Sequence, residues 1–167
     1  TFAAYSISIF FLLRAAGRFL GAWLLGRIQW QAALALFRGG ILMCFAISIV
    51  GGLRWAVYLL PLSGLFMSVI YPTLNSKGIS CLPKSEHGAG AGVILFFTCV
   101  SAVAAPLAIG AVGDAFGHII YGFWLATGFA VLLFAGAVMN WLVNPTRRVL
   151  VQFEATEYQA RAVDDLA

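Results

Sequence analysis

The sequence predicts an all-α transmembrane protein with five membrane-spanning helices. Of its 167 residues, 62% are hydrophobic and only 10% are charged, whereas soluble domains carry about 25% charged residues. Several apolar runs reach the roughly 20 residues that a helix needs to cross about 30 Å of hydrocarbon. Runs such as 41–50 and 131–139 lack the alternating polarity of barrel strands. The sequence therefore does not predict a soluble enzyme, a disordered chain or a β-barrel.

Five apolar runs give the predicted spans, at about residues 2–25, 33–52, 55–76, 90–112 and 118–142. Short segments rich in glycine or polar residues separate them, so consecutive helices are expected to run antiparallel. Residues 146–167 have mixed charge and are expected to form a C-terminal tail in the cytoplasm. The chain enters its first apolar run at Thr1 without a basic leader or a cleavage site, and we therefore expect it to belong to a longer protein.

The distribution of basic residues predicts the orientation. Lys and Arg concentrate on the cytoplasmic loops of membrane proteins. On one side of the predicted topology only Arg54 is basic, whereas the other side holds Arg27, Arg38, Lys77, Lys84, Arg147 and Arg148. This asymmetry places the C-terminus in the cytoplasm. Because the basic residues are scattered singly, the net charge of +4 does not indicate a nucleic-acid partner.

The first span carries two arginines and a pair of glycines. Gly17 and Gly21 have the four-residue spacing that lets helices pack closely in lipid. At 1.5 Å per residue from Arg27, Arg18 lies about 13 Å and Arg14 about 20 Å inside the membrane. An arginine at the centre of a bilayer costs about 2.5 to 3.5 kcal/mol or more. Arg18 can extend toward the interface, whereas Arg14 indicates either a watery pathway or a structural partner.

The third span contains a proline that predicts a helix break. Pro72 lacks the N–H of a helical hydrogen bond and its ring clashes with the preceding turn. Broken membrane helices are tolerated where they line a cavity enclosed by protein. Tyr71, Thr73 and Asn75 would there offer hydroxyl and amide groups to a sugar. The alternative is a packing kink whose polar groups are satisfied locally.

The last two spans are joined by a short glycine-containing segment. Asp114 and Gly117 predict a tight interhelical turn capped by the carboxylate, with clamping of the two helices as the alternative. The small-residue spacing recurs at Gly88 and Gly92. The two histidines lack metal-ligand spacing, and no nucleophile or phosphate-binding signature is present. No metal, cofactor or catalytic residue is therefore predicted, and we do not expect an enzyme.

Three segments resemble a known family. Residues 17–25 (GRFLGAWLL), 66–73 (FMSVIYPT) and 110–117 (GAVGDAFG) are similar to the fucose permease branch of the major facilitator superfamily, which comprises sugar:proton symporters. The order and spacing resemble helices eight to twelve of that twelve-helix fold over about residues 2–145. The resemblance implies an inner-membrane carrier in contact with lipid, and it implies that N-terminal helices missing from this chain complete the pathway.

The combined prediction is the C-terminal part of a proton-coupled sugar transporter that works by alternating access. Its predicted solute ligands, for a monosaccharide or similar solute, are Arg14, Tyr71, Thr73 and Asn75. Structural or gating roles are predicted for Arg18, Gly17, Gly21, Pro72, Asp114 and Gly117.

Two features depart from the family pattern. Asn75 and Lys77 occupy positions that are typically apolar in the permeases. In addition, the family's coupling carboxylates lie in the other half of the fold. The alternative function is a stand-alone five-helix membrane protein that acts in assembly or binds a partner.

Overall fold

The part of the chain that the structure describes is helical. The computed structural model describes residues 2–144 and 150–151, and it contains no strand in these ranges. Its elements are α1 (Phe2–Leu25), α2 (Trp30–Gly51), α3 (Leu53–Met67), α4 (Ile70–Ile79), the short 3-10 helix η1 (Lys84–Glu86), α5 (His87–Ala115) and α6 (Ile119–Val143). Apart from residues 150–151, the predicted tail lies outside the described residues.

Five segments of the described chain are long and apolar enough to cross a membrane. They correspond to α1, to α2, to α3 and α4 together, to η1 with α5, and to α6. The predicted fold class of five membrane-spanning helices is confirmed. The helices are thus compatible with a multi-pass membrane protein.

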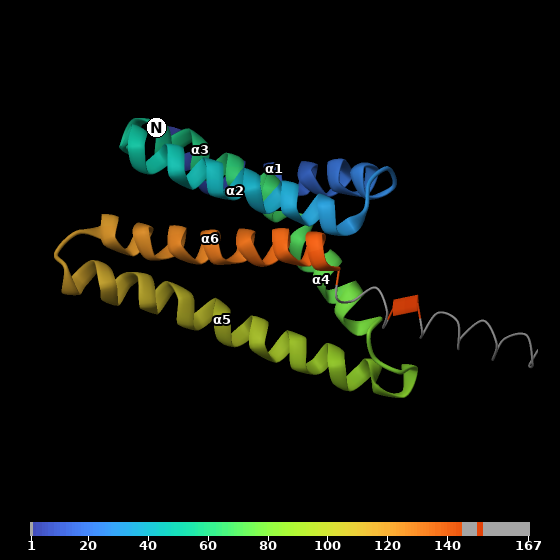
Figure 1. The fold of residues 1–167 in the computed structure, drawn as a ribbon. Helices are drawn as coiled ribbons and strands as arrows, with labels where there is room; N and C mark the ends of the chain where they lie inside the picture. The colour runs from blue at the N-terminus through green and yellow to red at the C-terminus, as the bar shows by residue number, and fades with distance from the viewer. Residues whose placement is uncertain (1, 145–149, 152–167) are drawn as a thin grey trace, which may run out of the picture.

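The helices pack in an order that differs from their order in the chain. Helix α3 lies between α1 and α2, α2 also packs on α6, and α6 packs on α5. Helix α4 leads from the end of α3 toward η1 and α5 (Figure 1). The α1–α2 and α4–α5 connections lie at the same end of the molecule as the C-terminus of α6 (Figure 1). Arg27, Lys77 and Lys84 therefore lie toward one end and Arg54 at the other. Arg38, which the orientation prediction counts with the first group, lies inside α2 and not in a loop.

Helix α2 forms the core of the described chain. It buries Leu34, Phe37, Ile41 and Cys44 between α3 and α6. Helix α5 buries almost nothing, because apart from α4 and η1 it packs only on α6. Large apolar side chains cover the outside of the molecule, and this much exposed apolar surface suits contact with lipid or with other helices.

Candidate functional site

The third membrane segment is interrupted one turn before Pro72 by two residues that keep right-handed helical backbone angles. Helix α3 ends at Met67 and α4 begins at Ile70, and the two intervening residues are Ser68 and Val69. Pro72 lies in the first turn of α4, where backbone N–H groups have no partner within the helix and a missing one costs little. The hydroxyl of Ser68 donates to the carbonyl oxygen of Leu65 at 2.7 Å. The break therefore falls one turn before the proline.

Helix α1 approaches this break closely because two of its residues lack side chains. A Cβ atom on Gly17 would meet the Leu65 carbonyl oxygen and the side chain of Ser68. A Cβ atom on Gly21 would meet the side chain of Val69. The predicted glycine pair thus lies in the contact between α1 and α3, where small residues let backbones approach. This contact places the next residue of α1, Arg18, beside the break.

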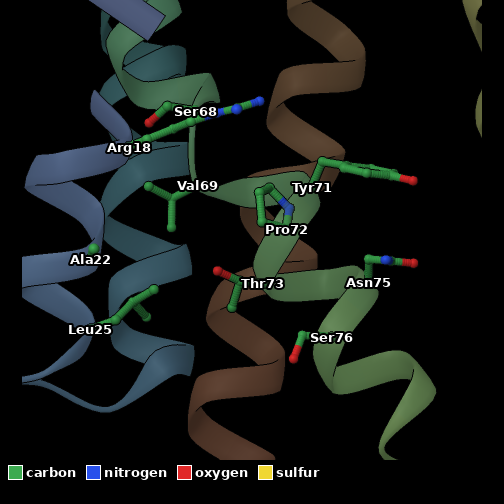
Figure 2. A pocket seen from close by; sticks show the side chains of 10 residues that line it. All are labelled: Arg18, Ala22, Leu25, Ser68, Val69, Tyr71, Pro72, Thr73, Asn75 and Ser76. Atoms are coloured by element: carbon green, nitrogen blue, oxygen red, sulfur yellow. The ribbon is translucent and has the colours of Figure 1, made fainter. Parts of the chain in front are cut away.

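An open groove lies between the C-terminal half of α1 and the break (Figure 2). Its volume is about 600 Å³, within the range of about 300 to 1,000 Å³ typical of small-molecule sites. The groove brings together side chains from α1, the break and α4. They are Arg18, Ala22, Leu25, Ser68, Val69, Tyr71, Pro72, Thr73, Asn75 and Ser76.

The polar side chains of α4 point in two directions. The side chains of Tyr71 and Asn75 extend to the same side of α4, away from α1 (Figure 2). The hydroxyl of Thr73 points toward α1 instead (Figure 2), and its residue is only 8% exposed, whereas Tyr71 is 39% exposed. Three predicted solute ligands therefore line one groove, but only Tyr71 and Asn75 share a face.

Arg18 lines the groove and Arg14 does not. The Arg18 side chain crosses above Ser68 and ends above the start of α4, between α1 and Tyr71 (Figure 2). Arg18 is exposed, and it makes no hydrogen bond or ion pair with any residue in the described ranges. Arg14 is partly buried on α1, about 6 Å further from the groove at 1.5 Å per residue. Arg18, for which a structural or gating role is predicted, therefore lines the groove. Arg14, which is a predicted solute ligand, does not.

The turn between α5 and α6 lies at the opposite end of the molecule from the α1–α2 and α4–α5 connections (Figure 1). Gly117 has φ +73°, a conformation that glycine adopts without strain. Its N–H donates to the carbonyl oxygen of Asp114 at 3.3 Å. The predicted carboxylate cap is wrong, because the N-cap residue of α6 is His118 and no side chain caps it. Backbone groups close this turn.

The other repeated glycine pair makes no close contact. A Cβ atom on Gly88 or Gly92 would have nothing within 4 Å in the described chain. Among the described residues, this pair therefore marks no helix contact, whereas Gly113 of α5 is buried and its Cβ position lies 3.5 Å from Cα of Ile119. The close approach between α5 and α6 occurs at Gly122 instead, where a Cβ atom would lie 2.5 Å from the carbonyl oxygen of Ile109.

Two polar contacts that no sequence motif indicates join α2 to α6 and to Asn144, the residue that follows α6. Nε2 of Gln31 donates to Oδ1 of Asn144 at 2.8 Å. Nη1 of Arg38 donates to the backbone carbonyl of Leu133 at 3.0 Å, and its buried Nε has no partner in the described chain. In the sequence, Arg38 is informative only for the predicted orientation. Its partner is a backbone carbonyl, and no sequence motif indicates such a contact.

Among the described residues, no group of three His, Cys, Asp or Glu side chains gathers to hold a metal ion. No family model matches the chain, and no curated protein or solved structure is significantly similar to it. The resemblance to the fucose permeases therefore depends on the three motif segments alone and stays a prediction. The proposed function therefore rests on the groove.

Proposed function

We propose that this chain is part of a secondary transporter that carries a small polar solute, of the size of a monosaccharide, across the inner membrane. The groove between α1 and the α3–α4 break is its contribution to the solute pathway. The observation that carries the proposal is that polar side chains line this groove within a bundle of apolar helices. Polar groups inside a membrane protein usually mark a solute or ion pathway.

The chemistry of the groove suits a hydroxylated solute. The phenol of Tyr71 donates and accepts hydrogen bonds, and the amide of Asn75 does both as well. Neither side chain makes a hydrogen bond with a described residue. These groups are therefore available to replace the water that a sugar loses when it leaves solution. Ala22, Leu25 and Val69 add apolar surface for the carbon face of a ring.

The open shape of the groove suits a pathway that further helices complete. Solute carriers bind near the middle of the membrane beside discontinuous helices, and they work by rocking two bundles around the site. In this proposal the described helices form one wall, and N-terminal helices outside this sequence form the other. Proton coupling and a cytoplasmic C-terminus complete the proposal; the first comes from the family resemblance and the second from the basic residues.

The proposal is tested by uptake measurements on the full-length protein. A panel of labelled monosaccharides, with and without a pH gradient, first identifies a transported solute. Tyr71→Phe and Asn75→Ala then each remove one hydrogen-bonding group. We expect the initial uptake rate to fall by about two- to tenfold for each variant, because a hydrogen bond contributes about 0.5 to 1.5 kcal/mol and 1.4 kcal/mol is tenfold.

The matched control is Tyr121→Phe. Tyr121 is exposed in the first turn of α6, outside the groove, and its ring centroid lies 5.1 Å from that of Phe116. Uptake by this variant is expected to equal that of the unmodified protein. Immunoblotting of membranes verifies that all variants are present at equal levels. Unchanged uptake by both groove variants would remove the site assignment.

A further inference from the structure

The charge of the groove points to the chemical class of its solute. Among the described residues that line the groove, Arg18 alone carries a charge. The acidic residues of the described chain are Glu86, in η1, and Asp114, near the end of α5, and neither lines the groove. An arginine side chain stays protonated at any physiological pH. The described wall of the groove is therefore positively charged.

Two other arginines of the chain have partners, whereas Arg18 has none among the described residues. Arg27 lies over the ring of Trp23 at 4.3 Å from its centroid. Arg38 donates to the carbonyl of Leu133. Arg18 instead extends into the groove between Ser68 and Tyr71 (Figure 2). A guanidinium presents a planar fork of donors that matches the two oxygens of a carboxylate.

We propose that the solute is a polyhydroxylated carboxylate, such as a sugar acid, whose carboxylate pairs with Arg18. This inference rests on the proposed transport function and narrows it from neutral sugars to anionic ones. The hydroxyls of the solute bind Tyr71 and Asn75, which line the same groove as Arg18. Charge-assisted hydrogen bonds are roughly twice as strong as neutral ones, so the carboxylate dominates the affinity.

The test compares sugars with the acids that differ from them only at one carbon. The full-length protein is placed in nanodiscs of phosphatidylcholine, and dissociation constants are measured by calorimetry. The ligand pairs are galactose with galacturonate, glucose with glucuronate and mannose with mannuronate. We expect at least one acid to bind about tenfold more tightly than its neutral sugar, and its affinity to fall as salt is added.

Variants of Arg18 and Arg27 distinguish binding of the acid in the groove from a general effect of positive charge. Arg18→Gln is expected to bring the affinity of the acid down to that of the sugar. Arg18→Lys keeps the charge but loses the fork of donors, and an intermediate affinity is expected. Arg27→Gln is the matched control, since it removes an equal charge from the same end of the molecule but outside the groove. Its affinity for the acid is expected to be unchanged.

Each outcome decides one point. Equal binding of acid and sugar overturns the charge preference and leaves the proposed transport of a polar solute intact. No binding in any pair overturns the proposed function itself. Equal losses in Arg18→Gln and Arg27→Gln overturn the assignment to Arg18. If phosphatidylglycerol added to the nanodiscs abolishes binding of the acid even at a salt concentration that screens the charge of the membrane surface, Arg18 holds the anionic lipid and the solute assignment is overturned.

Discussion

Adding a single methyl group at Gly17 tests the contact that forms the groove. In Gly17→Ala, the new Cβ atom would meet the Leu65 carbonyl oxygen, and it would lie 2.5 Å from Oγ and 3.0 Å from Cβ of Ser68. Unstrained contacts of this kind have at least about 3.4 Å between the atoms. The two helices must therefore separate by about 1 Å, or the break between α3 and α4 must shift.

The expected loss of stability follows from two opposing terms. Overpacking of a close contact costs roughly 1 to 3 kcal/mol. Alanine in place of glycine favours the helix by up to about 1 kcal/mol. We expect Gly17→Ala to lower the free energy of unfolding by up to about 2 kcal/mol, and to leave it about 1 to 3 kcal/mol below that of Gly92→Ala. Gly92→Ala in α5 is the matched control, because nothing lies within 4 Å of its Cβ position and only the favourable term remains.

The free energy of unfolding is measured in mixed micelles with an increasing fraction of dodecyl sulfate, and helix content is followed by circular dichroism. A second substitution sharpens the test. Ser68→Ala removes one of the two nearest atoms, so it should restore part of the stability lost in Gly17→Ala, while the Leu65 carbonyl remains in the way. If Gly17→Ala and Gly92→Ala agreed within about 0.5 kcal/mol, the close approach of α1 and α3 would be refuted.

Two further contacts make predictions in the same assay. Gly122→Ala should have a free energy of unfolding about 1 to 3 kcal/mol below that of Gly128→Ala, because its Cβ would lie 2.5 Å from the Ile109 carbonyl oxygen, whereas Gly128→Ala in the same helix meets nothing. Equal effects would contradict the α5–α6 contact. The double variant Gln31→Leu with Asn144→Leu should lose less free energy of unfolding than the two single variants lose in sum. The expected difference is about 0.6 kcal/mol or more. A coupling near zero would show that their hydrogen bond does not contribute.

The sequence predicts the helices well because lipid imposes a simple rule on length and polarity. The first span, 2–25, coincides with α1, and the last, 118–142, differs from α6 by one residue at each end. The second was expected to begin at 33, but α2 begins at Trp30. Its first turn includes the polar Gln31, which is satisfied by Asn144 at the far end of the described chain. Local polarity does not reveal that long-range partner.

The sequence predicts where the helix is interrupted but not which arginine lies beside the interruption. Pro72 predicts a clash with the carbonyl of Ser68, one turn earlier, and the structure places the interruption at Ser68 and Val69. Arg14 and Arg18 are one turn apart on the same side of α1. Which of them lines the groove depends on the level at which α1 meets the break. Packing at the glycine pair sets that level. The spacing of the glycines predicts a close contact, but it does not predict which residues of the third segment they meet.

Packing and solute binding are coupled at this site. A break in a membrane helix leaves backbone groups that lipid cannot satisfy, so it persists only where protein covers it. At the break, the hydroxyl of Ser68 donates to the Leu65 carbonyl, and α1 covers both residues through Gly17. The residue that follows in α1 is Arg18, so the contact that protects the break also sets the position of the charge. Loss of binding in Gly17→Ala would therefore report a displaced Arg18 and not a lost solute contact, whereas Arg18→Gln removes the charge and leaves the contact in place.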